Sequence, residues 1–290
     1  MKAYDEIRQG EKGAWVSIIS YLLLSALKLL VGLASGSQAL LADGLNNTTD
    51  IIASVAILIG LKISRKPPDP DHHYGHFRAE TIAAMVASFI MAAVGLQVLY
   101  QAGTKFFKPA LEKPDLFAAW IALICAFVMF GVYKYNRQLA KRINSKAIMA
   151  AAQDNRSDAF VSVGAFVGIV GSQFGLPWLD PLSALFVGAI ICKTAWTIFH
   201  DASHALTDGF DVEELEQITH TIKKTPGVEA IRDIKARFHG NNVLVDVTIE
   251  VDNLLNVVES HEITEKIEER MLSKHDIMHV QIHIEPADKD

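Results

Sequence analysis

Long uncharged stretches alternate with short polar segments between about Gly13 and Phe199. A helix that crosses a membrane needs roughly 20 predominantly apolar residues. Six stretches reach this length if polar residues are tolerated inside the second and the fifth, and they are Trp15–Leu33, Ala39–Leu61, Ile82–Tyr100, Leu116–Tyr135, Ile148–Val170 and Leu179–Phe199. The pattern therefore predicts an all-α membrane domain with six transmembrane helices.

The pattern changes after Leu206, where charged residues become dense. Asp211 fits the N-cap of a helix, and the sequence HGNN between two apolar runs is typical of a hairpin turn. The expected elements are a helix after Asp211, strands Ile231–Phe238 and Val243–Val251, a helix Val257–Leu272 and a strand Ile277–Glu285. We therefore expect a transmembrane domain over 1–205 and an α+β tail over 206–290. The tail's α-β-β-α-β order suits a small sheet with helices on one face.

Composition supports a membrane protein and excludes one class of partner. The chain is 50% hydrophobic, with a mean hydropathy of +0.23, which is too apolar for an ordinary soluble domain. The 206–290 tail contains nineteen acidic and nine basic residues, whereas nucleic-acid binding needs basic surface. Cys125 and Cys192 each lie inside an apolar span, which favours buried free thiols over a disulfide. The expected partners are a lipid bilayer and small cations, not nucleic acid.

Basic residues set the expected orientation, because cytoplasmic loops are enriched in Lys and Arg. With the N-terminus in the cytoplasm, the outer segments carry only Lys105, Lys108 and Lys113, and the other connections carry many more bases. Six spans then return the acidic tail to the cytoplasm. The sequence predicts a multi-pass protein of the plasma membrane with both termini in the cytoplasm.

Polar residues inside the second and fifth spans point to chemistry at membrane depth. Asp43, Asn46, Asn47 and Asp50 are three or four residues apart, as are Asp154 and Asp158, so each set shares one helix face. A carboxylate at bilayer depth costs a few kcal/mol, and such residues usually face a water-filled cavity that forms an ion or proton path.

Two structural explanations compete with an ion path. Lys28 in the first span and Arg156 in the fifth could each neutralise one carboxylate. This pairing would still leave an excess of buried acid. Asp43 lies near the outer end of its span and could be only a solvated end residue.

The segment after the second span is rich in histidine. It contains DPDHHYGH, in which Asp69, His72 and His76 have the spacing of a chelate. Imidazole and carboxylate together suit first-row divalent metals. The alternative is a solvated polar loop without metal.

The tail offers a weaker set of candidate ligands. His261 lies in the predicted second helix of the tail, while His279, His283 and Glu285 alternate with apolar residues along its last strand. These side chains could bind metal, or they could form an ordinary solvated strand face.

Together these motifs resemble those of the cation diffusion facilitator family of divalent-metal exporters. The resemblance covers nearly the whole chain and depends on LADGLNNTTD, DHHYGHFRAE, DNRSD and HVQIHIEP. It implies a six-helix membrane domain, a metallochaperone-like cytoplasmic tail and a homodimer. It also implies metal/proton antiport by alternating access, with no organic cofactor.

The resemblance implies an intramembrane transport site at Asn46, Asp50, Asp154 and Asp158. Zinc branches of the family usually place His at the first position of one or both pairs. The all-oxygen set here suits Mn²⁺ better, so the chain resembles the manganese branch. A Zn²⁺, Fe²⁺ or Co²⁺ exporter of the same family is the alternative.

The resemblance also assigns the sites outside the membrane. The loop site would be Asp69, His72 and His76. The tail site carries over only in part, as His261, His283 and Glu285, because two positions that are His in zinc relatives are Arg232 and Thr248 here. A charge lock of the dimer would use Arg78 and Asp208.

Two functions outside this family or mechanism compete with a metal exporter. An intramembrane aspartyl protease needs two aspartates on separate helices, since like-charged neighbours can share a proton. Its GxGD signature is absent, because Asp50 follows NTT and Asp158 follows NRS. A passive metal channel is compatible with the sequence and stays open as an alternative.

Overall fold

The computed structural model describes residues 2–35, 38–107, 116–176 and 178–287. The chain divides into two compact units, Met1–Ala202 and Ser203–Asp290, and each is described by itself. Lys108 and Lys113, on which part of the orientation argument rests, lie outside the described residues.

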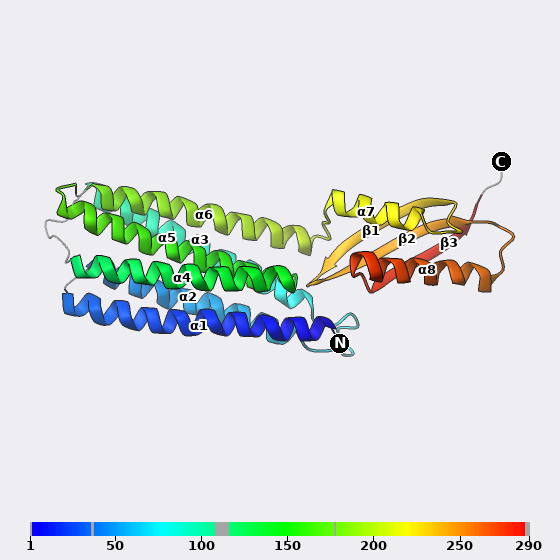
Figure 1. Ribbon diagram of the computed structural model, residues 1–290, viewed down its shortest axis with the longest axis horizontal. Helices are drawn as coiled ribbons and strands as arrows, with labels where there is room; N and C mark the ends of the chain where they lie inside the picture. Colours follow the sequence, from blue (N-terminus) through cyan, green and yellow to red (C-terminus); the bar gives the residue numbers. More distant parts are fainter. Residues whose placement is uncertain (1, 36–37, 108–115, 177, 288–290) are drawn as a thin grey trace. The chain divides into compact units, whose positions relative to one another are not determined.

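Over its described residues the first unit is a bundle of long helices (Figure 1). They are α1 (Lys2–Ser35), α2 (Gln38–Ser64), α3 (Arg78–Phe107), α4 (Leu116–Arg142), α5 (Lys146–Gln173) and α6 (Leu179–Leu206). Each predicted span falls inside one of these helices, and each helix is longer than its predicted span. Hydropathy marks only the part that suits hydrocarbon, whereas a helix continues through polar turns at its ends. The predicted helical membrane domain is confirmed.

Within the described residues, four segments are long and apolar enough to cross a membrane. These are Asp5–Ala34, Asn46–Ser64, Arg78–Thr104 and Leu116–Arg142. Helix α5 does not qualify by composition, because Asp154, Arg156 and Asp158 interrupt it near its middle. The residues that lower its hydropathy are thus the same ones that make it a candidate for chemistry.

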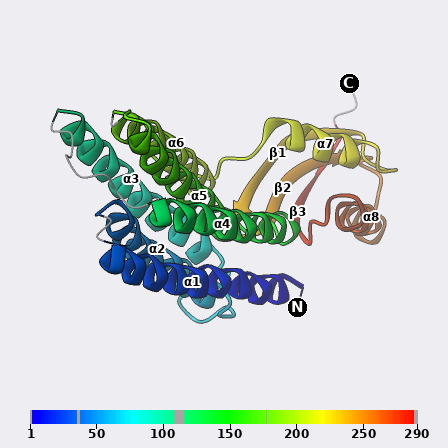
Figure 2. The ribbon, with the colours of Figure 1, turned by 60° about the vertical axis from the view of Figure 1, so that its left-hand side comes forward.

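The helices pack through small residues and three apolar clusters, one of which is an extended core. All of α1 to α6 contribute to this core, with Ile18, Ile57, Met91, Leu139 and Ile191 among its members. A Cβ added at Gly60 of α2 would lie 2.2 Å from the Cβ of Ala83 in α3. Small residues of this kind let membrane helices approach closely. Figure 2 shows the same helices from a second direction.

The second unit is a sheet covered by two helices in its described residues. Its elements are α7 (Val212–Lys223), β1 (Ala230–His239), β2 (Asn242–Val251), α8 (Val257–His275) and β3 (His279–Pro286). The strand order is β1-β2-β3, with β1 antiparallel and β3 parallel to β2. The predicted α+β tail with the order α-β-β-α-β is confirmed.

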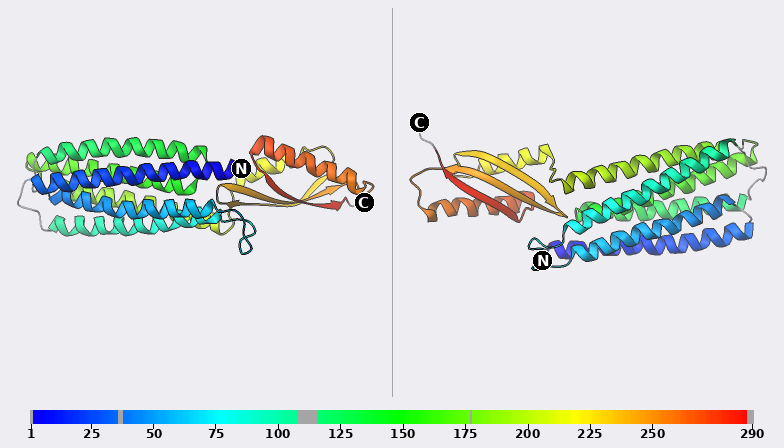
Figure 3. Two further views of the ribbon diagram at one scale, coloured as in Figure 1. Left: turned by 90° about the horizontal axis from the view of Figure 1, so that it is seen from below. Right: turned by 180° about the vertical axis from the view of Figure 1, so that it is seen from behind.

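Local sequence explains how this unit is built. Asp211 caps α7 by accepting a hydrogen bond from the backbone N–H of Glu214, and Gly240 takes a positive φ of 64° in the hairpin turn. Both helices lie on one face of the sheet (Figure 3). Alternate residues of β2 belong to the core shared with these helices, which contains Ile218, Ile222, Val245, Val247, Ile249, Val251, Ile263, Ile267 and Met271. The other face of the sheet carries the polar residues.

Candidate metal-transport site

The four predicted ligands lie on two helices that pack against each other. Asn46 and Asp50 are one turn apart on α2, and Asp154 and Asp158 are one turn apart on α5. Asp50 is 5% exposed and Asp158 is 3% exposed. The three carboxylates interact electrostatically with one another. The amide of Asn46 donates a long hydrogen bond of 3.5 Å to Asp50 Oδ2.

The three carboxylates are neighbours without converging on one point. The ligand atoms of Asp50, Asp154 and Asp158, all described, do not lie within 4.8 Å of one another. Both oxygens of Asp158 are buried, and neither forms a hydrogen bond of standard geometry in the described part of the chain, although the Asn47 side chain interacts with this carboxylate. A buried carboxylate without a direct ion pair is costly, so this group is suited to receive a cation.

Helix α1 supplies the support for Asp154, which sequence reasoning missed. The Tyr21 hydroxyl donates a 3.0 Å hydrogen bond to Asp154 Oδ2 and accepts one of 3.0 Å from the Asn155 amide. Ser17 and Asn136 both donate to Asn155 Oδ1, at 3.1 and 2.9 Å. This buried network orients the Asp154 carboxylate, and it uses the Asn155 side chain for hydrogen bonds between helices. The available signal was the polar series Ser17, Tyr21, Ser25 and Lys28, which shares one face of an apolar helix.

Lys28 forms an ion pair with Asp43. Its ammonium lies 2.9 Å from Asp43 Oδ2, and both side chains are almost fully buried. Asp43 is therefore no solvated helix end. Arg156 lies over the ring of Tyr133, 6.0 Å from its centroid. Lys28 thus pairs directly with Asp43, and its charge also acts on Asp158 of α5 without direct contact.

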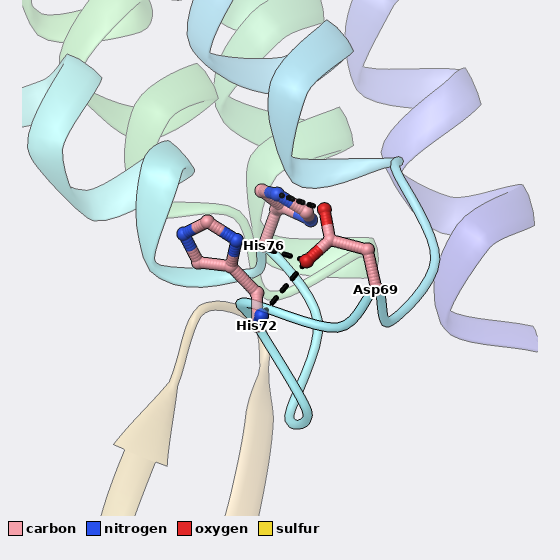
Figure 4. Close-up of side chains that lie close together, drawn as sticks. All are labelled: Asp69, His72 and His76. Carbon is pink, nitrogen blue, oxygen red and sulfur yellow. Dashed lines mark hydrogen bonds and ion pairs between the residues drawn. The ribbon is translucent and has the colours of Figure 1, made fainter.

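The three predicted loop ligands lie close together in the loop between α2 and α3 (Figure 4). His72 Nδ1 lies 3.1 Å from Asp69 Oδ1, and His76 Nε2 lies 3.4 Å from Asp69 Oδ2. All three ligand atoms lie within 4.8 Å of one another, the one such group of His, Cys, Asp or Glu among the described residues. The arrangement can hold a divalent cation without large movement of the loop.

Asp69 is fixed by its own loop. Its Oδ1 accepts hydrogen bonds from the backbone N–H groups of Asp71 and His72, at 3.1 and 2.8 Å. Slight desolvation acts to raise the pKa of Asp69, but the bonds from the His72 ring and from these N–H groups outweigh it and lower the pKa below its ordinary value. The carboxylate is therefore held in the ionised form that binds metal.

The tail residues are not gathered in the same way. His283 Nε2 lies 3.7 Å from Glu285 Oε1, on the polar face of the sheet. His261 belongs to α8, which packs on the opposite, apolar face, and it lies 3.7 Å from Glu265. Arg232 forms an ion pair with Glu285 and another of 2.9 Å with Glu250. The guanidinium group of Arg232 is therefore bound to these two carboxylates. Position 232 is one at which the family resemblance expects His in zinc transporters.

The two residues of the predicted charge lock lie in different units. Arg78 is the first residue of α3, and Asp208 follows α6 with a φ of 61°. Each takes part in interactions of its own. Their pairing stays a prediction.

A helical membrane bundle with buried carboxylates on facing helices, joined to an α+β tail, defines a transporter of metal cations. Residues 14–207 match the family model described as "Cation efflux transmembrane domain", and residues 210–287 match "Cation efflux protein, cytoplasmic domain". The chain belongs to the cation efflux, or cation diffusion facilitator, family. Its members transport divalent metals and are not enzymes, which excludes the protease alternative.

Similar proteins include two described as manganese exporters. The chain is 56% identical over 289 residues to "Manganese efflux system protein MneS" of Bacillus subtilis (strain 168), covering 100% of both chains. It is 32% identical to "Manganese efflux system protein MneP" of the same strain, covering 95% of each. It is 32% identical to "Magnetosome protein MamM" of Magnetospirillum gryphiswaldense, covering 90% of this chain and 83% of that one. The solved structure "MamM CTD - Copper form" covers 27% of this chain and 87% of its own, at 25% identity and a TM-score of 0.25.

Proposed function

We propose that this protein exports Mn²⁺ from the cytoplasm in exchange for protons. The observation that carries the proposal is the all-oxygen set of Asn46, Asp50, Asp154 and Asp158, which includes buried carboxylates on two packed helices. Carboxylate and amide oxygens suit Mn²⁺, while Zn²⁺ gains more from imidazole. The full-length similarity to a protein described as a manganese efflux system protein supports the same ion.

The transport cycle follows from the position of these ligands. Metal from the cytoplasm binds between α2 and α5, and the carboxylates offset its charge. Rocking of the helices then opens the site to the outside, as in transporters with sites near the membrane midplane. Protons compete there for the carboxylates and displace the metal. Proton entry down its gradient drives the return of the empty site.

The remaining parts have supporting roles in this proposal. The protein is a homodimer in the plasma membrane, with a transmembrane domain over 1–205, a cytoplasmic domain over 206–290 and both termini in the cytoplasm. The Asp69 loop site captures metal at the cytoplasmic side. Arg78 and Asp208 form the charge lock of the dimer. His261, His283 and Glu285 regulate transport if the tail rearranges to bind metal.

Reconstituted protein provides the test. We expect proteoliposomes to accumulate Mn²⁺ against its gradient only when a pH gradient is imposed, and to move Mn²⁺ faster than Zn²⁺, Fe²⁺ or Co²⁺. Asp158→Asn, which keeps the side-chain shape, is the matched control for leakage. Mn²⁺ flux that does not depend on the pH gradient would favour the passive channel. Zn²⁺ transport faster than Mn²⁺ transport would favour the zinc exporter.

A further inference from the structure

Lys28 of α1 is a buried lysine whose ammonium group is fully bonded. Its Nζ lies 2.9 Å from Asp43 Oδ2 and donates to Asn47 Oδ1 and to Ser162 Oγ, both at 3.2 Å. The side chain has no exposed area. An ammonium group has three N–H donors, so all of them are used. The acceptors come from α2 and α5, the two helices that carry the proposed ligands.

The ammonium group therefore lies beside the transport site. Asn47 follows Asn46 directly, and Ser162 is four residues after Asp158, about one turn or 6 Å along α5. Lys28 interacts electrostatically with Asp50 and with Asp158. Neither oxygen of Asp158 forms a hydrogen bond of standard geometry among the described residues. Asp43 acts on the same two carboxylates in the opposite sense and less strongly than Lys28, so the field of Lys28 prevails at both.

Asp43 explains why Lys28 does not bind Asp158 directly. Asp43 Oδ2 also accepts a 3.4 Å hydrogen bond from Ser162, so it is held where it meets the ammonium group. This bonding keeps the lysine one turn away from the ligands, where it cannot compete with a metal for the same oxygens. Its charge still reaches the site, because Coulomb interactions are strong away from water.

We propose that Lys28 is a fixed positive charge of the transport site that weakens the hold of the carboxylates on a dication and so permits its release. Lys28 acts through Asp50 and Asp158 and is a positioning residue, not a ligand. The inference rests on the proposed function, since it assumes that these carboxylates carry the metal. A transported ion must bind well enough to enter and weakly enough to leave, and a buried lysine sets that balance.

The competing explanation is that Lys28 and Asp43 only hold α1 against α2. Removing one partner of a buried ion pair strongly destabilises a protein, whereas replacing both is often tolerated. The test variant is therefore Lys28→Met combined with Asp43→Asn. Ser25→Ala is the matched control, because the Ser25 hydroxyl donates to Gly44 O at 2.9 Å and joins the same two helices without charge.

The experiment measures Mn²⁺ transport by purified, reconstituted protein whose folding is verified by thermal unfolding. We expect the double variant to lower the apparent KM for Mn²⁺ about tenfold and to lower kcat by a similar factor, because the field of Lys28 at Asp50 and Asp158 is larger than the opposing field of Asp43 that is removed with it. Ser25→Ala should change neither by more than about twofold. Parental KM and kcat in the folded double variant, or a raised KM, would overturn the proposal.

Two further measurements keep the outcome decisive. Lys28→Gln retains hydrogen-bond donors without the charge and should lower KM in the same direction. If neither this variant nor the double variant folds, Lys28 is a structural link and the proposal fails. Asp158→Asn is measured in parallel, because normal transport by that variant would refute the proposed site itself, whatever the Lys28 variants do.

Discussion

The acidic residues of the membrane unit and those of the tail are arranged in opposite ways. Asp158 is 3% exposed, and its oxygens form no hydrogen bond of standard geometry among the described residues. In the tail, the Glu250 and Glu285 side chains are 20% and 29% exposed, and Arg232 binds both. The tail arrangement is ordinary for a protein surface, where charges pair at low cost. In the membrane unit the burial of Asp158 is costly, and a bound cation or proton would offset that cost.

This difference separates the proposed transport site from a surface whose acidic residues are already paired with Arg232. A carboxylate within a membrane helix lowers stability and is usually functional. The Glu250 and Glu285 carboxylates are already paired with Arg232, so they are not free to bind a metal. The same residue type therefore has different meanings in the two units, and the following experiments test that contrast.

The largest effect should come from removing the membrane carboxylates. Asp50→Ala, Asp154→Ala and Asp158→Ala should each reduce Mn²⁺ flux by about a hundredfold or more, because each removes a proposed ligand. The measurement is initial flux into proteoliposomes with verified folded protein. Asp201→Ala is the control, since that side chain is 63% exposed. Normal flux in any folded ligand variant would remove that residue from the site.

The next effect concerns the choice of ion. Asp154→His, alone or with Asn46→His, should raise the ratio of Zn²⁺ to Mn²⁺ flux by about tenfold, because imidazole favours Zn²⁺ over Mn²⁺. Both ions are compared at a matched pH gradient. An unchanged ratio in variants that still transport would show that these positions do not select the ion.

Loss of the hydrogen bond from Tyr21 of α1 to Asp154 should reduce the rate of transport. Tyr21→Phe removes the donor to Asp154 and leaves the Asn155 amide without its acceptor. We expect kcat for Mn²⁺ to fall by about tenfold, as for other partners of metal ligands, and stability to fall by about 1–3 kcal/mol. Tyr100→Phe, at a tyrosine that is 74% exposed, is the matched control. Equal kcat values for the two variants would contradict the role of Tyr21.

In the tail, the opposite change is to release Glu250 and Glu285 from their ion pairs with Arg232. Arg232→His removes the cation from Glu250 and Glu285 and adds an imidazole, so Zn²⁺ affinity of the tail should rise about fivefold. Calorimetry on residues 206–290 measures this change. Arg237→His is the control, because Arg237 is opposite Leu244, which offers no ligand. Equal affinities would show that Arg232 does not block a site.

The loop should give the smallest effect. His76→Ala removes one member of the group with Asp69 and His72, and we expect flux at low Mn²⁺ to fall about twofold with kcat unchanged, since the proposed path still has its own ligands. His73→Ala, beside the group and not part of it, is the control. A complete loss of transport in folded His76→Ala protein would place the loop on the path itself.

Much of the architecture could be predicted because its causes are local. Apolar windows marked the membrane helices, and strict alternation in β3 separated Val280, Ile282 and Ile284 from His279, His283 and Glu285. The three carboxylates of the proposed site, Asp50, Asp154 and Asp158, were recognisable because a charge at membrane depth is rare and costly. The loop group was recognisable because its ligands lie within one short segment.

The sequence by itself determined the helical membrane bundle, the α+β tail and the residues able to bind a metal, since these depend on periodicity and on the cost of burying charge. Only the tertiary structure decided that Tyr21 supports Asp154, that Lys28 binds Asp43, and that Arg232 occupies Glu285. Each of these contacts joins residues distant in the chain. Their hydrogen bonds and charges depend on atomic separations that helix packing and strand register set, and no local pattern encodes those separations.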